Sequence, residues 1–149
     1  MDLYPLQFKA ISVETEWGSD LYDQCFSTET GESIGIIYQL VSNDKYDSVV
    51  TNGPLAGKKL SEIDRMGETY MGRRRIKGFP ICIKYLSTAS SLGLHVYPDE
   101  IALKTVDNVE MKDKVWYVVS HCEYATIQAE MKQTHTMQQL LSRVGTPAI

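Results

Sequence analysis

A histidine and a tyrosine at strand spacing are the first candidates for a binding or metal site in this sequence. His95 and Tyr97 are two positions apart in a run, residues 93–97, that has the composition of a strand. Residues i and i+2 of a strand share a face, so these side chains are expected to point into the same pocket. The consecutive His-Cys-Glu at residues 121–123 would point to alternating faces, which disfavours a metal site there.

Other residue types give no pattern of a catalytic centre. The acidic pair in residues 98–100 (Pro-Asp-Glu) follows a proline in a turn, and nothing brings an acid and a base to opposite ends of a substrate. No Ser-His-Asp, Cys-His or P-loop spacing is present. The cysteines are odd in number and far apart, which predicts reduced thiols rather than a metal knuckle or a disulfide framework: Cys25, Cys82 and Cys122.

Composition indicates one ordinary globular domain. The 149 residues include 15 Lys and Arg against 19 Asp and Glu, a formal net charge of −4, and 43% are hydrophobic. This balance excludes a disordered tail, a collagen-like fibre and a disulfide-framed mini-protein, and it argues against nucleic acid as a partner. The basic run over residues 72–78 is interpreted as a solvated loop. Without a signal-peptide pattern or about 18 consecutive apolar residues, we expect no membrane contact and a cytoplasmic protein.

The elements that must position these residues are mainly β. β-branched and aromatic runs predict strands over residues 34–40, 46–51, 79–86, 93–97, 115–119 and 124–129. Apolar residues at helical spacing predict a short helix near residues 60–72, with Ser61 as N-cap and Gly72 at its end. The same spacing predicts a second short helix over residues 136–144.

Several segments, in order, resemble a known family. Residues 48–58 read Ser-Val-Val-Thr-Asn-Gly-Pro-Leu-Ala-Gly-Lys, and residues 79–86 read Phe-Pro-Ile-Cys-Ile-Lys-Tyr-Leu. With residues 4–18, 94–100 and 112–118, they resemble the N-terminal half of type I phosphomannose isomerases. These are zinc-dependent cupin-fold enzymes that interconvert mannose 6-phosphate and fructose 6-phosphate. The resemblance implies a cupin-like (RmlC-like jelly-roll) barrel or partial barrel with two short helices, in a single domain over residues 1–149.

The zinc ligands that the resemblance implies are replaced in this chain. Where the family has a glutamine, a histidine and a glutamate, this sequence has His95, Tyr97 and Lys114, and the segment that carries the fourth ligand is not found. A neutral phenol is a poor zinc ligand. An ammonium about 4 Å from a dication would be repelled by roughly 8 kcal/mol at an effective dielectric of about 20. We therefore expect no metal cofactor.

The resemblance also implies which residues would meet a ligand. Lys84 and Lys112 match lysines that line the family's active site. Together with Lys114, His95 and the adjacent Tyr97, they are predicted to form a positive pocket that holds an anionic sugar without metal. No residue is predicted to be catalytic.

The leading hypothesis is a non-catalytic phosphomannose isomerase-like protein that binds a sugar or sugar phosphate in a regulatory or accessory role. One alternative is a metal-dependent mannose-6-phosphate isomerase completed by a partner chain. Another is a structural or interaction subunit. An open barrel would leave an unpaired strand edge, which favours a homodimer or closure by this chain's own rearranged strands. A second protein chain is the other partner considered.

Overall fold

A computed structural model describes residues 3–20, 33–72, 78–93, 95, 97–98, 100, 102–106 and 112–127 of the chain. It divides into two compact units, Met1–Val96 and Tyr97–Ile149, and each is described by itself.

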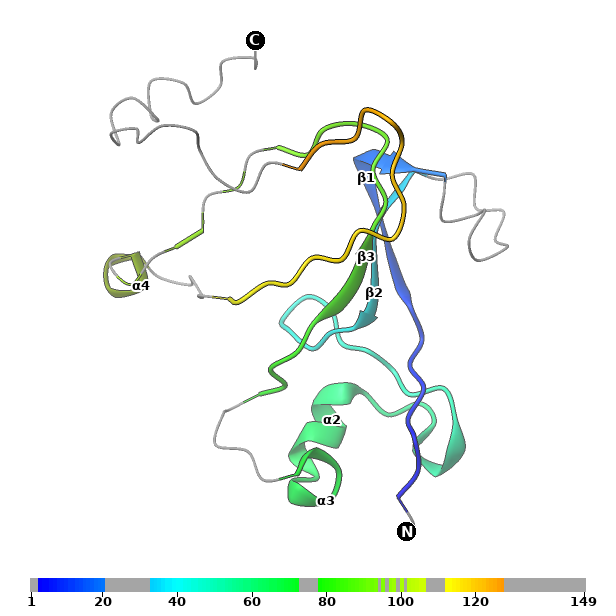
Figure 1. The fold of residues 1–149 in the computed structure, drawn as a ribbon. Coiled ribbons are helices and arrows are strands. Elements are labelled where there is room, and N and C mark those ends of the chain that lie inside the picture. The colour runs from blue at the N-terminus through cyan, green and yellow to red at the C-terminus, as the bar shows by residue number, and fades with distance from the viewer. Residues whose placement is uncertain are drawn as a thin grey trace. The chain divides into compact units, whose positions relative to one another are not determined.

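An antiparallel sheet forms the centre of the first unit (Figure 1). Its three strands lie in the order β1 (Ile11–Ser19), β2 (Ile34–Leu40) and β3 (Ile83–Leu86). β2 has the bounds predicted from its β-branched run, and its Ile34 and Ile37 are each only 2% exposed. β3 is shorter than the strand predicted over residues 79–86 and begins after Pro80, which has no N–H for a strand ladder. β1 was not predicted, although its exposure alternates along the strand as a half-buried strand requires.

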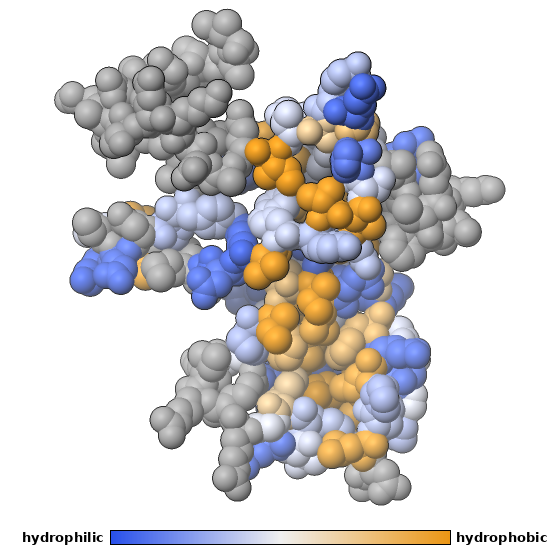
Figure 2. All heavy atoms as spheres, in the orientation of Figure 1, coloured by the Kyte–Doolittle hydropathy of each residue, from blue (hydrophilic) through white to orange (hydrophobic). Residues whose placement is uncertain are grey.

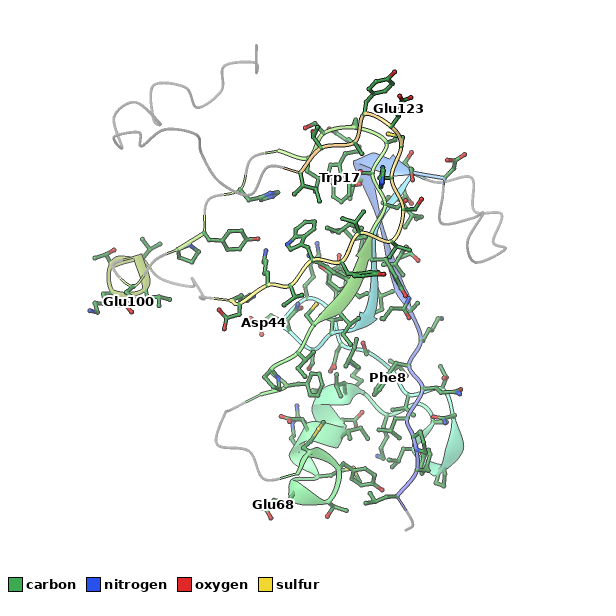
Figure 3. All side chains as sticks on the ribbon, in the orientation of Figure 1. Phe8, Trp17, Asp44, Glu68, Glu100 and Glu123 are labelled. Atoms are coloured by element: carbon green, nitrogen blue, oxygen red, sulfur yellow. The ribbon has the colours of Figure 1, made fainter. Side chains whose placement is uncertain are left out.

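A second cluster of apolar side chains lies beside the sheet in the same unit. Val50, Leu55 and Ile63 form its buried centre, and partly buried side chains pack around them: Tyr4, Leu6, Phe8, Tyr70 and Met71. Phe8 points from the N-terminal arm towards this cluster (Figure 3). The segment predicted as a strand over residues 46–51 contributes isolated bridges instead, Ser42 with Asp47, Val49 with Lys59 and Phe8 with Val50.

The loop at residues 52–57 holds the N-terminal arm in place. The Asn52 side chain accepts a hydrogen bond from the Gln7 N–H at 2.8 Å and donates one to the Pro5 carbonyl at 2.9 Å. The Tyr4 hydroxyl donates to the Asn52 carbonyl at 3.1 Å and accepts from the Leu55 N–H at 2.9 Å. We call these four hydrogen bonds the arm clasp. The segment with the most specific family resemblance, residues 48–58, therefore has a structural role in this chain.

Ser48 joins the sheet to the helix that follows the loop. It is fully buried, and its hydroxyl oxygen accepts the Val41 N–H at 2.9 Å. Its own N–H donates to the Val41 carbonyl at 2.8 Å, and its carbonyl accepts the Leu60 N–H at 2.7 Å. Because a buried backbone group without a partner costs about 1–3 kcal/mol, the small hydroxyl stabilises this junction.

The helix predicted near residues 60–72 is interrupted. It consists of α2 (Leu60–Arg65) and α3 (Glu68–Met71), separated where Gly67 takes a φ of 74°. α3 ends at Gly72 as predicted. Ser61 is not the N-cap, because α2 begins one residue earlier with Lys59 as its cap, and the Lys59 N–H donates to the Glu62 carboxylate at 2.8 Å. A one-turn helix of type 3-10, η1 (Gly53–Leu55), lies in the preceding loop.

The second unit contains α4 (Ala102–Thr105) and a segment over residues 112–127 that forms neither helix nor strand and turns at residues 123–124. The strand predicted over residues 115–119 is absent from this segment. Val115 is 98% and Tyr117 88% exposed. Although residues 115–119 have a β-forming composition, they pair with no strand among the described residues. The predicted helix over 136–144 lies outside the described residues, and the predicted strands over 93–97 and 124–129 fall partly outside them.

Exposed apolar residues also occur in the first unit. On and before β3, Ile81 and Ile83 are 54% and 52% exposed. Figure 2 shows hydrophobic residues at the surface of the molecule on the side that faces the viewer. No helix among the described residues has the length and apolar character needed to cross a bilayer.

Two glycine substitutions test the arm clasp. Gly53 and Gly57 have φ values of 62° and 88°, so alanine is expected to cost about 1–2 kcal/mol in backbone strain at either position. A Cβ on Gly53 would lie 2.5 Å from Cε2 of Tyr4, whereas a Cβ on Gly57 meets nothing within 4 Å. We expect Gly53→Ala to lower the free energy of unfolding by roughly 1–3 kcal/mol more than Gly57→Ala, measured by urea titration. Equal losses for the two variants would contradict the clasp.

Candidate functional site

Lys84 lies on β3 directly opposite Tyr38 of β2. Directly opposed residues of an antiparallel pair project from the same face of the sheet. The Lys84 Nζ lies 6.0 Å from the centroid of the Tyr38 ring, at the outer limit of a cation–π contact. The side chain is exposed. The register of β2 and β3 thus places this predicted site residue over an aromatic ring with its charge open to solvent.

A tight turn after β2 brings a second tyrosine to the same place. The Asn43 side-chain oxygen accepts hydrogen bonds from the N–H groups of Lys45 and Tyr46 at 2.9 and 2.8 Å, and the Asn43 N–H donates to the Tyr46 carbonyl. Such a side-chain to backbone turn is characteristic of asparagine. The turn folds the chain back, so that the Tyr46 ring lies 5.0 Å from the Tyr38 ring at an interplanar angle of 35°.

The turn carries a second ammonium as well. The Lys45 Nζ lies 5.1 Å from the centroid of the Tyr46 ring. Lys45, Tyr46, Tyr38 and Lys84 thus form one group of two rings and two cations, which we call the Tyr38 cluster. Sequence reasoning identified Lys84 and missed the other three. The signal available was an Asn turn flanked by a tyrosine on each side.

The other predicted site residues are placed as follows. His95 is exposed and belongs to the first unit. Tyr97, Lys112 and Lys114 belong to the second unit and are also exposed. Within that unit, the Lys114 Nζ lies 3.8 Å from the centroid of the Tyr97 ring, a close cation–π contact between residues far apart in sequence. We call this contact the Tyr97–Lys114 pair.

The donor set at these positions does not fit zinc. The Tyr97–Lys114 pair offers a phenol and an ammonium, and an ammonium repels a dication rather than binding it. Among the described residues, no three His, Cys, Asp or Glu side chains gather as a metal site would require. Cys82 and Cys122 are free and exposed thiols.

Known proteins with a similar sequence are mannose-6-phosphate isomerases. No protein-family model matches the chain. It is 29% identical over 122 residues to "Probable mannose-6-phosphate isomerase GmuF" of Bacillus subtilis, a match that covers 78% of this chain and 38% of that protein. "Mannose-6-phosphate isomerase ManA" of the same organism is 27% identical over 120 residues, with 80% and 38% covered. The chain therefore spans about two fifths of the length of these curated relatives.

A solved structure agrees with the sequence comparison. The crystal structure of the mannose 6-phosphate isomerase from Bacillus subtilis superposes with a TM-score of 0.60 at 26% identity. The match covers 68% of this chain and 33% of that one. The mainly β, cupin-like fold predicted from the sequence is confirmed.

We expect that Lys84 can be replaced without loss of the fold, so that a change in ligand binding can be assigned to the loss of its charge. The side chain is exposed, and an exposed cation–π contact contributes about 0.5–1 kcal/mol. We expect Lys84→Gln to change the free energy of unfolding by less than about 1 kcal/mol. Ile37→Ala on the neighbouring strand, at a site 2% exposed, is expected to cost about 2–5 kcal/mol. Urea titration of both variants decides this, and a large loss for Lys84→Gln would mean that Lys84 has a structural role.

Proposed function

Because this chain is a relative of the phosphomannose isomerases and matches their N-terminal part, we propose that it binds a sugar phosphate without isomerising it. The proposed ligand belongs to the class of hexose 6-phosphates named by the relatives. The proposed role is regulatory or accessory.

The Tyr97–Lys114 pair is the observation that carries this proposal. In the resembled family the positions of Tyr97 and Lys114 hold a histidine and a glutamate that bind the same zinc. Here the two side chains also meet, with 3.8 Å between the Lys114 Nζ and the centre of the Tyr97 ring. The contact supports a site in which these two positions still meet and the lysine's own positive charge takes the place of the metal.

A fixed ammonium can bind an anion but offers little to isomerisation. Ammonium groups donate charge-assisted hydrogen bonds to phosphate and hydroxyl oxygens. Aldose–ketose isomerisation moves a proton between adjacent carbons and needs a base within hydrogen-bond reach. Among the predicted site residues, Lys84, His95, Tyr97, Lys112 and Lys114, only His95 is a usual base near neutral pH. The phenol and ammonium of Tyr97 and Lys114 do not fit a zinc ion that would polarise the carbonyl. This donor set favours binding over turnover.

The remaining predictions about assembly stay predictions. They are the single domain over residues 1–149, a homodimer, and a second protein chain that completes the site. Completion by a second chain would supply the ligands that the isomerase alternative needs, and the activity assay below tests the case in which that chain is a second copy of this one.

Calorimetric titration of the metal-free chain with mannose 6-phosphate tests the proposal. We expect binding that persists in EDTA and is at least about tenfold tighter than binding of mannose, because the phosphate dianion meets the lysine charges. Lys114→Gln should weaken binding by about tenfold, while Lys9→Gln, an exposed lysine on the N-terminal arm, should not.

A coupled assay of mannose 6-phosphate and fructose 6-phosphate interconversion, with zinc added, completes the test. We expect no turnover above the buffer rate. Absence of binding by the wild-type chain, or turnover that depends on zinc, would overturn the proposal.

A further inference from the structure

We propose that the Tyr38 cluster is a phosphate-holding subsite in which Lys84 and Lys45 together bind a phosphomonoester and the two tyrosines position them. This inference rests on the proposed function, that a phosphate ester binds this chain, and it concerns residues of the first unit alone. The ligand chemistry is a phosphate dianion, carried by a hexose phosphate or present as inorganic phosphate.

Two separate pieces of backbone geometry bring the cations to the same aromatic pair. The β2–β3 register sets Lys84 opposite Tyr38, and the Asn43 turn sets Lys45 beside Tyr46. The rings are in contact, with their centroids 5.0 Å apart. Each ammonium therefore lies at one ring of this pair, although the two lysines are far apart in sequence.

Neighbouring carboxylates do not neutralise this charge. The contacts described for the two ammonium groups are with tyrosine rings, and neither group forms an ion pair with a described carboxylate. The Asp47 carboxylate is engaged elsewhere, because it accepts the Ser61 N–H at 3.1 Å. Asp44 is exposed near the tip of the turn (Figure 3). Two lysines that share no acidic partner are suited to an external anion.

The tyrosine rings restrict the conformations that the two lysine side chains adopt. A free lysine side chain loses up to about 2 kcal/mol of rotamer entropy when a ligand fixes it. A ring that already attracts the ammonium reduces this loss, while the flexible four-carbon stem still lets the group turn to a phosphate oxygen. The attraction depends on the ring and not on the hydroxyl. Tyr38 is therefore a positioning residue whose role phenylalanine can fill and leucine cannot.

Calorimetry on the full-length chain and four variants tests this, with mannose 6-phosphate, inorganic phosphate and mannose as probes. We expect Lys45→Gln to weaken the binding of mannose 6-phosphate and of inorganic phosphate by roughly tenfold, because one charge-assisted contact is lost. Tyr38→Leu should weaken the binding of both phosphates severalfold, whereas Tyr38→Phe should keep the wild-type affinity. Lys9→Gln is the matched control and should bind as the wild type. Urea titration of each variant confirms that the fold is kept.

The outcomes separate this inference from the function on which it rests. Wild-type binding of mannose 6-phosphate that Lys45→Gln leaves unchanged would overturn the subsite and leave the proposed function standing. Equal weakening by Tyr38→Phe and Tyr38→Leu would overturn the positioning role. No binding of either phosphate by the wild-type chain would overturn both. Binding of inorganic phosphate and mannose 6-phosphate with equal affinity would identify the phosphate alone as the ligand group of this subsite.

Discussion

The hydrogen-bonded segment from Ser48 to Leu60 is the constraint on which the described part of the first unit depends. At one end, Ser48 satisfies the buried Val41 backbone at the end of the sheet and receives the first N–H of α2. In the middle, Asn52 and Leu55 hold the N-terminal arm through the arm clasp. Sheet, arm and helix are thereby tied to one loop. This explains why a segment with strong family resemblance can persist in a chain whose predicted metal ligands have changed.

Charge is the point at which this chain departs from the resembled enzymes. Lys114 stands where the resemblance implies a glutamate, and this difference of two charge units is in the direction that excludes a divalent cation. The same change favours an anion, and Lys84 and Lys45 add positive charge in the first unit. The reversal at Lys114 thus accounts for the misfit to zinc and contributes to the proposed affinity for a phosphate ester.

Local sequence patterns predicted the helices and strands better than they predicted the contacts between side chains. β2 follows from its β-branched run, and β1 could have been predicted from the alternation of apolar and polar residue types that begins at Ile11. The break between α2 and α3 follows from Gly67, whose positive φ ends a helix that apolar spacing alone would continue. The meeting of Tyr97 with Lys114 is different, because no spacing rule joins them and only the resemblance placed both at one site. The Asn43 turn has a signal in the sequence, but the approach of the Tyr38 and Tyr46 rings to 5.0 Å depends on the detailed geometry of that turn, which the residue types do not fix.

Zinc titration of the metal-free wild-type chain and of the Tyr97→His/Lys114→Glu variant, followed by calorimetry, tests the central claim most directly. These two substitutions give back the histidine and the glutamate of the resembled zinc site and leave the fold's buried residues unchanged. We expect no zinc binding by the wild-type chain and measurable binding by the variant. Zinc binding by the wild-type chain as tight as or tighter than that of the variant would contradict the claim that Lys114 has taken the place of the metal.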